Sequence, residues 1–491
     1  MKTIKTIFKR KFVLSTVLLL VAIFASMLGV GLQSASAAGT LPCDLYATGG
    51  TPCVAAHSTT RALFSAYSGR LYQVQRDSDN AFTDIGTLAA GGYANAAAQD
   101  SFCANTTCII TKIYDQTTRH NDLGIAPAGG AGLADRGADA SLLKVTAGGH
   151  NVYGMWGNPR TGYRNNSTSG VPTGSASAGT YMVGSGTHFN SGCCFDYGNA
   201  ETNNLDTGNG DMGAVYLGSL CWFSCSGSGP WVMADLENGL FFGANGSYSG
   251  NTPVPYTFVT AMVKNTSTTY AIKGGNANSG SLKTMYSGAL PTTSGYTPLS
   301  LQGAIILGIG GDNSNSSIGS FYEGAMVAGQ PSDATENAVQ SNIVSVGYSQ
   351  VSTPSYNRLV NQNSNKCLDV QQDNKANGAN VGIYTCNGQL WQNWRLVDLH
   401  NGYYKIESQN SGRVLDVANC GTADGTNVQQ WDWLKNNCQQ WQKVTTTAPW
   451  FRLVNRNSGK VLDVNGCGTA DPTNVQQWTW LNNACQQWKT Q

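Results

Sequence analysis

The chain has 491 residues, which is enough for two or three domains. Charged residues make up only 12 %, and 29 Lys and Arg against 28 Asp and Glu leave a formal net charge of +1. This balance argues against a nucleic-acid partner, because a polyanion requires a basic surface.

The first forty residues have the pattern of a secretory signal peptide. Five basic residues among the first eleven precede an apolar run over 12–32, and the small residues Ala35, Ser36 and Ala37 follow. This order predicts cleavage between Ala37 and Ala38 and a secreted, extracellular protein. The alternative is an uncleaved membrane anchor, because the apolar run is close to bilayer-spanning length. No later run approaches that length, so no membrane contact is expected after cleavage.

All 14 cysteines follow this segment, and an even number in an exported chain favours disulfides. Zinc is the competing use, but none of the five His residues stands at ligand spacing with cysteines, so no metal or other cofactor is expected. Adjacent Cys193 and Cys194 either bond to separate partners or to each other. Close spacing predicts six local pairs and leaves these two for one another: Cys43–Cys53, Cys103–Cys108, Cys221–Cys225, Cys367–Cys386, Cys420–Cys438 and Cys467–Cys485.

Residues 38–348 have the pattern of an antiparallel β-sandwich. STTRALFSAYSGRLYQVQR, residues 58–76, predicts a helix capped at Ser58, and residues 332–348 predict a second helix capped at Ser332. Between them, short apolar runs alternate with Gly and Asn, without a βαβ rhythm. We therefore expect two packed sheets with the two helices outside them.

Two stretches of this region carry candidate catalytic carboxyl groups, of which hydrolysis of a glycosidic bond needs a pair. In PWVMADLENGLF, residues 230–241, a strand would place Asp235 and Glu237 on one face beside bulky apolar residues, which favours a sugar cleft over an exposed charge pair. In AIILGIGGDNSNSS, residues 304–317, a strand over its first six residues ends in two glycines and delivers Asp312. An Asx-turn is the alternative reading of Asp312.

The segment from about 42 to 347 resembles glycoside hydrolase family 54, the secreted α-L-arabinofuranosidases. The matching stretches are PCDLYATGGTPCVAAHSTTRAL, SFCANTTC, IYDQ, GYRNN, CCFDYGNAET, PWVMADLEN and AIILGIGGDNSN. The resemblance implies a β-sandwich and double displacement with retention, in which Glu237 is the nucleophile and Asp312 the general acid/base. The two carboxyl groups of a retaining site lie about 5–5.5 Å apart.

The resemblance also implies the groups that hold the sugar: Trp222, Asn238, Gly311 and a Cys193–Cys194 disulfide. Asp235 is expected to bind sugar hydroxyls and to raise the pKa of a neighbouring acid. Two features depart from the family pattern. Gly239 stands where an Asn is expected, and the predicted Cys221–Cys225 bridge flanks Trp222.

A predicted linker over 349–355, SQVSTPS, separates this domain from an internal repeat over 356–491. Three copies keep a constant spacing of 47 residues, and each contains an LDV segment and ends in Gln-x-Trp. Such a repeat indicates one supersecondary unit used three times. About four short strands per copy predict a β-trefoil.

The repeats resemble the ricin-type lectin domain, a family 13 carbohydrate-binding module. In this type an Asp accepts from two sugar hydroxyls, an aromatic ring forms a platform and amides complete the site. The residues would be Asp369 with Tyr384 and Gln392, Asp416 with Gln429, Trp431 and Gln439, and Asp463 with Gln476, Trp478 and Gln486. The Gln-x-Trp residues are also predicted to belong to the core.

The first copy departs from the other two, because Gly382 stands where they have Gln429 and Gln476. The residue before the last Gln of each copy, commonly Asn in this lectin type, is Trp391, Cys438 or Cys485. Binding is therefore expected at the second and third copies, to xylan or arabinose-bearing chains.

Together these features predict an all-β, secreted, monomeric α-L-arabinofuranosidase that acts on plant cell-wall arabinoxylan or arabinan and is targeted by its trefoil. One alternative is a β-xylosidase or a bifunctional enzyme, because xylopyranose and arabinofuranose place similar hydroxyls. A non-catalytic secreted lectin is the other. The predicted boundaries are 1–37 for the signal peptide, 38–348 for the sandwich, 349–355 for the linker and 356–491 for the trefoil.

Overall fold

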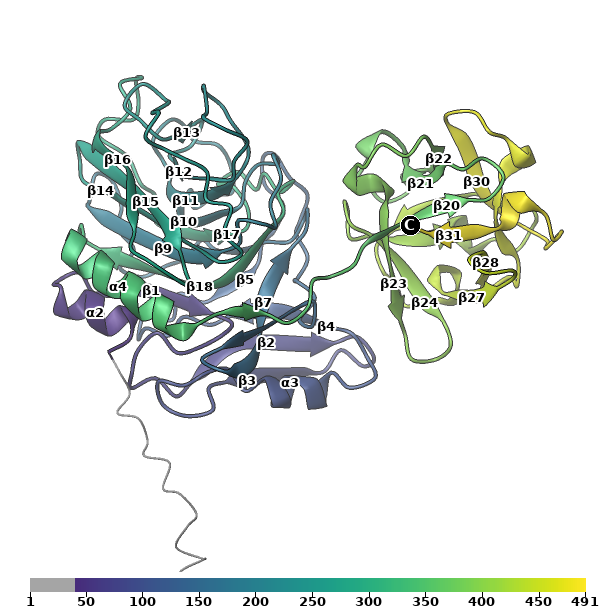
Figure 1. The fold of residues 1–491 in the computed structure, drawn as a ribbon, viewed down its shortest axis with the longest axis horizontal. Helices are drawn as coiled ribbons and strands as arrows, with labels where there is room; N and C mark the ends of the chain where they lie inside the picture. Colours follow the sequence, from purple (N-terminus) through teal and green to yellow (C-terminus); the bar gives the residue numbers. More distant parts are fainter. Residues whose placement is uncertain (1–39) are drawn as a thin grey trace, which may run out of the picture. The chain divides into compact units, whose positions relative to one another are not determined.

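The computed structural model describes residues 40–491, a unit whose strands gather in two halves (Figure 1). The predicted signal peptide lies outside the described residues. Within residues 40–491, no helix combines the length and the apolar character needed to cross a bilayer.

The first half of this unit contains a nine-stranded antiparallel sheet, in which β1 pairs with β18 beside the main path. In sheet order its strands are β16 (Lys283–Ala289), β15 (Thr269–Asn276), β14 (Val259–Asn265), β9 (Ala178–Gly184), β18 (Gly319–Ala328), β7 (His150–Gly157), β6 (Leu143–Ala147) and β19 (Ser349–Gln350), with β1 (Cys53–Ser58) off the path. Because β19 pairs with β6, the first two residues of the predicted linker belong to this sheet.

A second antiparallel sheet of ten strands packs on the first. Its order is β13 (Leu240–Phe241), β12 (Trp231–Asp235), β11 (Gly213–Gly218), β10 (Asp196–Ala200), β17 (Ala304–Leu307), β8 (Tyr163–Asn165), β5 (Leu123–Ile125), β4 (Cys108–Ile113), β2 (Arg70–Arg76) and β3 (Phe82–Gly86). Strands β11 and β12 contact β9, β14 and β15 of the first sheet, and one large apolar core lies between the two. The predicted antiparallel sandwich is confirmed.

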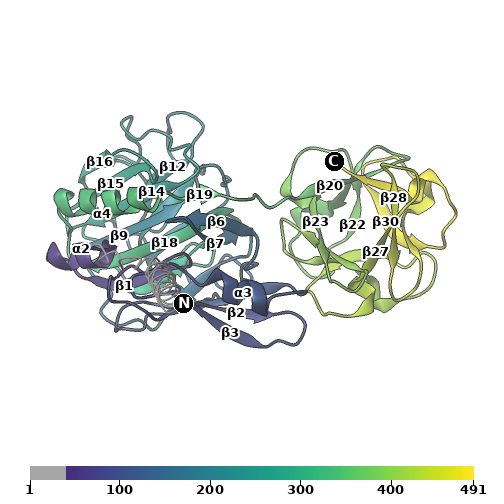
Figure 2. The ribbon, with the colours of Figure 1, turned by 60° about the horizontal axis from the view of Figure 1, so that its bottom comes forward.

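The described helices of this half are α2 (Pro42–Thr48), α3 (Ala96–Phe102) and α4 (Asp333–Val346). The prediction of α4 is confirmed, since the Ser332 side chain accepts from the Thr335 amide and Gly347 ends the helix at φ 60°. Lys264 on β14 and Lys273 on β15 both donate to the buried Glu336 of α4. Helix α4 therefore lies against the first sheet, beside α2 (Figures 1 and 2).

The predicted helix over residues 58–76 is wrong. The Ser58 hydroxyl does accept from the amides of Thr60 and Arg61, as a cap would, but Ser58 ends β1 and residues 70–76 form β2. In that strand, pairing with β3 and β4 satisfies the backbone, and Val74 packs into the core. Pairing of this strand within the sheet thus overrode a local helix signal.

The second half is a β-trefoil of twelve strands, four per copy, as the repeat predicts. The strands are β20 (Asn357–Asn361), β21 (Cys367–Val370), β22 (Val381–Tyr384), β23 (Asn393–Asp398), β24 (Tyr404–Ser408), β25 (Val414–Val417), β26 (Val428–Trp431), β27 (Trp441–Thr445), β28 (Phe451–Asn455), β29 (Val461–Val464), β30 (Thr473–Trp478) and β31 (Trp488–Thr490). Single 3-10 turns join them: Gln371–Asp373, Leu390–Gln392, Ala418–Cys420, Asn437–Gln439, Asn465–Cys467 and Ala484–Gln486.

The three copies share one core and one polar ring. The side chains of Trp394, Trp441 and Trp488 are fully buried, and each indole N–H donates to the carbonyl of the Leu that precedes the pocket-lining Asp of its copy. Three asparagine side chains, one per copy, donate to one another in a closed ring at 2.8–2.9 Å: Asn380, Asn427 and Asn474. The 47-residue period therefore reflects threefold packing.

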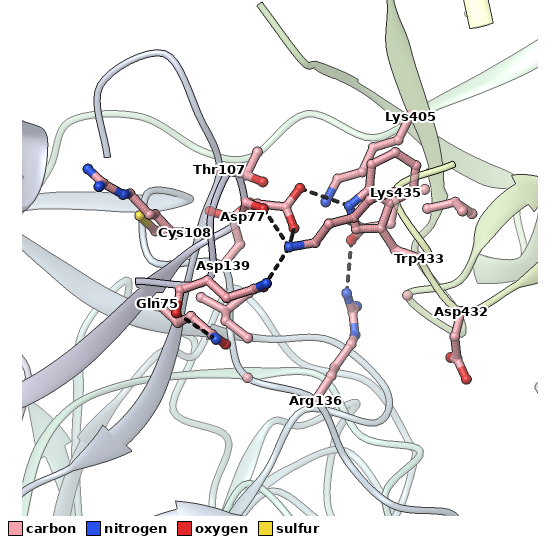
Figure 3. Close-up of a pocket in the computed structure, with 17 residues that line it drawn as sticks. Gln75, Asp77, Thr107, Cys108, Arg136, Asp139, Lys405, Asp432, Trp433 and Lys435 are labelled. Atoms are coloured by element: carbon pink, nitrogen blue, oxygen red, sulfur yellow. Dashed lines mark hydrogen bonds and ion pairs between the residues drawn. The ribbon is translucent and has the colours of Figure 1, made fainter. Parts of the chain in front are cut away.

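Polar side chains of the two halves also meet within the compact unit (Figure 3). Trp433 Nε1 donates to a carboxylate oxygen of Asp77 at 2.8 Å. Arg136 donates to Glu407 at 2.9 Å, and these residues line a cavity of about 330 Å³.

Candidate active site

The second sheet brings acidic residues from separate strands to one place. In its register Ala214 of β11 pairs with both Asp235 of β12 and Gly198 of β10. Asp196, two residues before Gly198 on β10, therefore lies one row away from Asp235 on the same face. Asp196 is fully enclosed, and Asp235 is 6 % exposed.

The chain turns sharply after Asp235, which corrects the prediction of a continuous strand through Glu237. Strand β12 ends at Asp235, and the Glu237 amide donates to Asp235 Oδ1 at 3.1 Å. Glu237 and Asn238 both have left-handed backbone conformations, with φ of 63° and 51°. The Tyr296 hydroxyl donates to the Glu237 carbonyl at 2.8 Å, so the turn is fixed from outside. Glu237 is 7 % exposed, so Asp235 and Glu237 are both buried and do not form an exposed charge pair.

Asp312 stands five residues beyond β17, which ends two residues earlier than predicted. One of its oxygens accepts from the Ser314 amide at 2.9 Å, so the Asx-turn is present, and the side chain remains partly exposed. Gly311 allows close packing here, because a Cβ on it would lie 1.9 Å from Glu201 Oε2 and 2.6 Å from the Met212 sulfur. No larger residue fits at that position without displacing Glu201.

The adjacent cysteines are bonded to each other, and the other six pairs are joined as the spacing predicts. Both sulfurs of Cys193 and Cys194 and a carboxylate oxygen of Asp235 lie within 4.8 Å of one another. The Ser314 hydroxyl reaches the Cys193 sulfur at 3.5 Å. The disulfide thus lies between Asp235 and the loop that carries Asp312.

The remaining predicted sugar contacts lie on surface loops. Trp222, inside the Cys221–Cys225 bridge, is 49 % exposed. Asn238 is exposed and donates to Asp206 at 3.0 Å. Gly239 has a steric explanation, because a Cβ there would lie 2.2 Å from the Phe241 ring. The aromatic ring occupies the space in which an Asn side chain was expected.

Sequence reasoning missed three charged residues of this site: Arg164, Asp196 and Glu201. Arg164 of β8 donates to the carbonyl oxygens of both Gly311 and Glu201, and Glu201 is fully buried just after β10. All three lie in stretches that match the family, GYRNN and CCFDYGNAET. The available signal was the presence of charged residues in and next to short strands of a chain with few charges.

Burial and mutual repulsion raise the pKa values of these acids. Burial raises the pKa of Asp235 to about 6, although a hydrogen bond from Asp196 opposes the rise. Burial raises the pKa of Glu237 to about 10, and the charges of Asp235, Glu201 and Asp312 add to it. Burial also raises the pKa of Asp196 well above its ordinary value. The cluster therefore retains protons around neutral pH.

The trefoil has three pockets, each lined by the predicted Asp and its aromatic residue. Their volumes are about 380, 180 and 280 Å³ for the first, second and third copies. In the second and third, Gln429 and Gln476 donate to Asp416 and Asp463 at 2.9 Å. The second and third pockets therefore have the same arrangement of Asp, Gln and Trp.

The first pocket lacks the Gln that the other two copies have at the position of Gly382, and a different Gln supplies the amide. A Cβ on Gly382 would lie 2.6 Å from Gln371 Nε2, so the Gln371 amide occupies the space next to this glycine. Gln371, Trp391 and Tyr384 line the pocket with Asp369, and Tyr384 is 40 % exposed. The absence of a Gln at position 382 therefore does not leave the first pocket without an amide.

The Gln of each Gln-x-Trp lies behind its pocket. Gln392, Gln439 and Gln486 are fully buried and bond backbone groups of their own loops, as the core prediction expects. Gln392 also donates to the carboxylate of its site, Asp369, at 2.9 Å, and hydrogen bonds from Gln439 and Gln486 oppose the rise that burial gives to the pKa values of Asp416 and Asp463. These bonds hold the pocket loops in place, and a direct contact of the three Gln side chains with sugar stays a prediction.

A β-sandwich that gathers buried carboxyl groups beside an exposed Trp, joined to a trefoil with three Asp-aromatic pockets, defines a modular glycoside hydrolase. The model of the α-L-arabinofuranosidase B catalytic family matches residues 42–349, and that of the ricin-type β-trefoil lectin-like domain matches residues 345–431 and 437–491. The chain belongs to the α-L-arabinofuranosidase B family, glycoside hydrolase family 54, and carries a ricin-type trefoil at its C-terminal side.

Similar proteins agree with this assignment. A probable α-L-arabinofuranosidase B of Aspergillus clavatus is 58 % identical over 339 residues, which cover 67 % of each chain. An arabinofuranosidase/β-xylosidase of Trichoderma koningii is 60 % identical over 323 residues, or 64 % of each. A solved arabinofuranosidase complexed with arabinofuranosyl-α-1,2-xylobiose is 39 % identical with a TM-score of 0.64, over 90 % of this chain and 99 % of that one.

Proposed function

We propose that this enzyme is secreted and removes terminal non-reducing arabinofuranose from arabinoxylan or arabinan with retention of configuration. The observation that carries the proposal is the enclosed acidic cluster around Glu237, whose pKa is raised by burial first and then by the charges of Asp235, Glu201 and Asp312, because the reaction needs two neighbouring carboxyl groups. The seven disulfides among the described residues and the predicted leader support an extracellular location.

In the first step Glu237 attacks the anomeric carbon, while Asp312 donates its proton to the departing glycosidic oxygen. A covalent arabinosyl ester on Glu237 results. In the second step Asp312 takes a proton from water, the water attacks the same carbon and the Glu237 carboxylate leaves. The fixed turn at Glu237 and the partial exposure of Asp312 suit these roles.

The groups around the pair are proposed to hold one furanose ring. Asp235 accepts from sugar hydroxyls, and the Cys193–Cys194 disulfide beside it forms a rigid apolar wall. Trp222 offers an exposed aromatic face on a loop closed by its own disulfide, while Asn238 and Gly311 complete the set. The small wall suits a single terminal sugar, in keeping with exo action.

The trefoil is proposed to keep the enzyme on the polysaccharide. The second and third pockets have matched Asp, Gln and Trp residues, so we expect them to bind the same sugar unit. The first pocket has its own amide and two aromatic side chains, which supports binding there as well. The enzyme is proposed to act as a monomer.

Hydrolysis of 4-nitrophenyl α-L-arabinofuranoside and 4-nitrophenyl β-D-xylopyranoside tests the proposal. We expect faster release from the arabinofuranoside, and loss of both activities in Glu237→Gln. Faster release from the xyloside would favour β-xylosidase activity, a second candidate supported by the similarity to the arabinofuranosidase/β-xylosidase of Trichoderma koningii. Full activity of Glu237→Gln would remove the nucleophile assignment.

A further inference from the structure

One asparagine side chain ties the segment before the adjacent cysteines to residues 312–318, which we call the acid/base loop. Asn190 Oδ1 accepts from the Gly192 amide at 3.1 Å and from the Ile318 amide at 3.0 Å. Asn190 Nδ2 donates to the Ser316 carbonyl at 3.0 Å, across 126 residues of sequence. The side chain is half-buried, and its oxygen and its nitrogen both bond backbone groups. A single amide therefore holds both sides of this joint.

The two segments also bond to each other directly. The Ser316 amide donates to the Cys193 carbonyl at 2.9 Å, and the Ser316 hydroxyl donates to the same oxygen at 3.3 Å. The Cys194 amide donates to the Ser314 carbonyl at 3.3 Å. The close approach depends on a glycine, because a Cβ on Gly192 would lie 2.3 Å from the Ser316 carbonyl oxygen. The disulfide and the acid/base loop are therefore one hydrogen-bonded unit.

The backbone of Asn190 extends this unit to a third part of the site. Its carbonyl accepts from the Ser219 amide at 3.0 Å, near the start of the loop that carries Trp222. A Cβ on Gly218 would lie 3.3 Å from the same carbonyl oxygen, so the backbone packs closely here. The disulfide, the Trp222 loop and the acid/base loop are therefore all bonded to the segment of Asn190.

We propose that Asn190 is a positioning residue, which sets the Asp312 carboxyl group in the right place for a sugar held against the Cys193–Cys194 disulfide. This inference rests on the proposed function, in which the disulfide holds the furanose and Asp312 is the acid/base residue. Asp312 accepts from the Ser314 amide, and the Ser314 carbonyl accepts from the Cys194 amide. A shift of the acid/base loop against the disulfide therefore moves the acid relative to the bound sugar.

Such a role predicts a loss of rate that depends on the leaving group. Misplacement of a catalytic group by about 1 Å can cost about 100-fold in rate. A departing alkoxide needs the proton of the acid, whereas 4-nitrophenolate leaves readily without it. Lower stability alone would reduce the amount of folded enzyme and would lower both rates by the same factor. The leaving-group dependence therefore separates positioning from a purely structural role.

The test compares Asn190→Ala and Asn190→Asp with the parent on two substrates that share the arabinofuranose ring, 4-nitrophenyl and methyl α-L-arabinofuranoside. In Asn190→Ala, kcat/KM is expected to fall about 100-fold on the methyl glycoside and less than about tenfold on the nitrophenyl glycoside. Asn190→Asp keeps oxygen acceptors for the Gly192 and Ile318 amides and loses only the donor to Ser316. Its loss on the methyl glycoside should therefore be smaller.

Gly192→Ala tests the same joint without changing Asn190. Its methyl group would press on the Ser316 carbonyl, so the methyl glycoside should again lose far more than the nitrophenyl glycoside. Gly124→Ala is its control and should match the parent on both substrates, because a Cβ there meets no atom within 4 Å. This pair decides the question if Asn190→Ala does not fold.

Asn121→Ala is the folding control, since the Asn121 side chain also makes three hydrogen bonds to backbone groups, those of Val54 and Ser169. It should lower the melting temperature and leave the ratio of the two kcat/KM values unchanged. Circular dichroism checks the folding of all variants.

Equal losses on the two glycosides in both Asn190→Ala and Gly192→Ala, or parental values in both, would overturn the inference. Asp312→Asn separates that result from a failure of the proposed function. If Asp312→Asn shows the leaving-group dependence and the other two variants do not, only the positioning role falls. If Asp312→Asn shows no such dependence either, Asp312 is not the acid and the proposed function fails.

Discussion

In the trefoil, the carboxylates of Asp416 and Asp463 each accept from an amide thirteen residues further along the same copy. In the sandwich, Arg164 bonds carbonyl oxygens 37 and 147 residues away, and among the described residues no amide or hydroxyl donor is placed on the buried carboxyl groups of Asp196 and Glu201. A carboxylate with a donor stays ready to accept from a sugar hydroxyl. Carboxyl groups crowded without donors retain protons, which acid–base chemistry needs. The same side chain therefore serves binding in one half and reaction in the other.

The largest expected effect is the loss of catalysis in the sandwich while the trefoil still binds polysaccharide. Glu237→Gln should lower kcat by at least about 10⁴-fold on every substrate, because the nucleophile is lost. Asp312→Asn should lose about 100-fold or more on arabinoxylan but much less on the nitrophenyl glycoside, whose leaving group needs no proton. Steady-state kinetics on both substrates measure this, and binding to insoluble arabinoxylan should stay intact in both variants. Equal losses on both substrates in Asp312→Asn would remove its role as the acid.

A second substitution tests the crowding of the sandwich site. Gly311→Ala would drive its methyl group into the Glu201 carboxyl group, so kcat should fall about 100-fold through displacement of reacting groups. Gly124→Ala on β5 is the matched control, because a Cβ there meets no atom within 4 Å. It should leave kcat unchanged. Similar kcat values for the two variants would contradict the packing described for Gly311.

Effects of intermediate size are expected when one disulfide is removed from either half. Cys193→Ala/Cys194→Ala should raise KM about tenfold by removing the wall beside Asp235. Cys467→Ala/Cys485→Ala, which opens a bridge with a sequence separation of 18 in the trefoil, should instead cost about 2–4 kcal/mol of stability without changing KM. Kinetics on the nitrophenyl glycoside and thermal melts record both. An unchanged KM in the first variant would exclude the disulfide from the sugar site.

The smallest effect on catalysis is expected from the trefoil pockets. Trp431→Ala combined with Trp478→Ala should weaken binding to insoluble arabinoxylan about tenfold, since each ring is a binding platform. Cleavage of the nitrophenyl glycoside should stay unchanged. Trp480→Ala is the control, because Trp480 is a half-buried Trp of the third copy that lies outside the pocket. This variant should bind as the parent does. Parental binding of the double variant would mean that the trefoil sites lie elsewhere.

The same contrast explains what could be predicted from the sequence. The trefoil repeats its pattern every 47 residues, so its strands, its buried Trp residues and the Asp of each pocket could be read directly. The sandwich was predictable as a class from short apolar runs, and its two proposed catalytic residues only through the family resemblance. Within it, helix α4 followed from a local cap at Ser332 that the structure retains.

The features that could not be predicted from the sequence depend on contacts between segments that are distant in the chain. Residues 58–76 carry a helix signal but become β2, because the strands that pair with them stand elsewhere in the chain. The alternation around Glu237 suggested a strand, whereas the hydrogen bond from Tyr296 and left-handed backbone make a turn. The packing of Glu201 against Gly311 joins segments 110 residues apart and could not be predicted from either stretch alone. In the first copy the Gln371 side chain supplies the amide that Gly382 lacks, although Gln371 does not align with Gln429 and Gln476 in the repeat.

The central claim is that Glu237 forms a covalent bond with the sugar and that the configuration is therefore retained. Proton NMR of the first turnovers on 4-nitrophenyl α-L-arabinofuranoside measures this directly, before the free sugar equilibrates. The account predicts that the α anomer of arabinose appears first and the β anomer later. A β anomer formed first would show inversion by direct attack of water and would contradict the assignment of Glu237 as nucleophile.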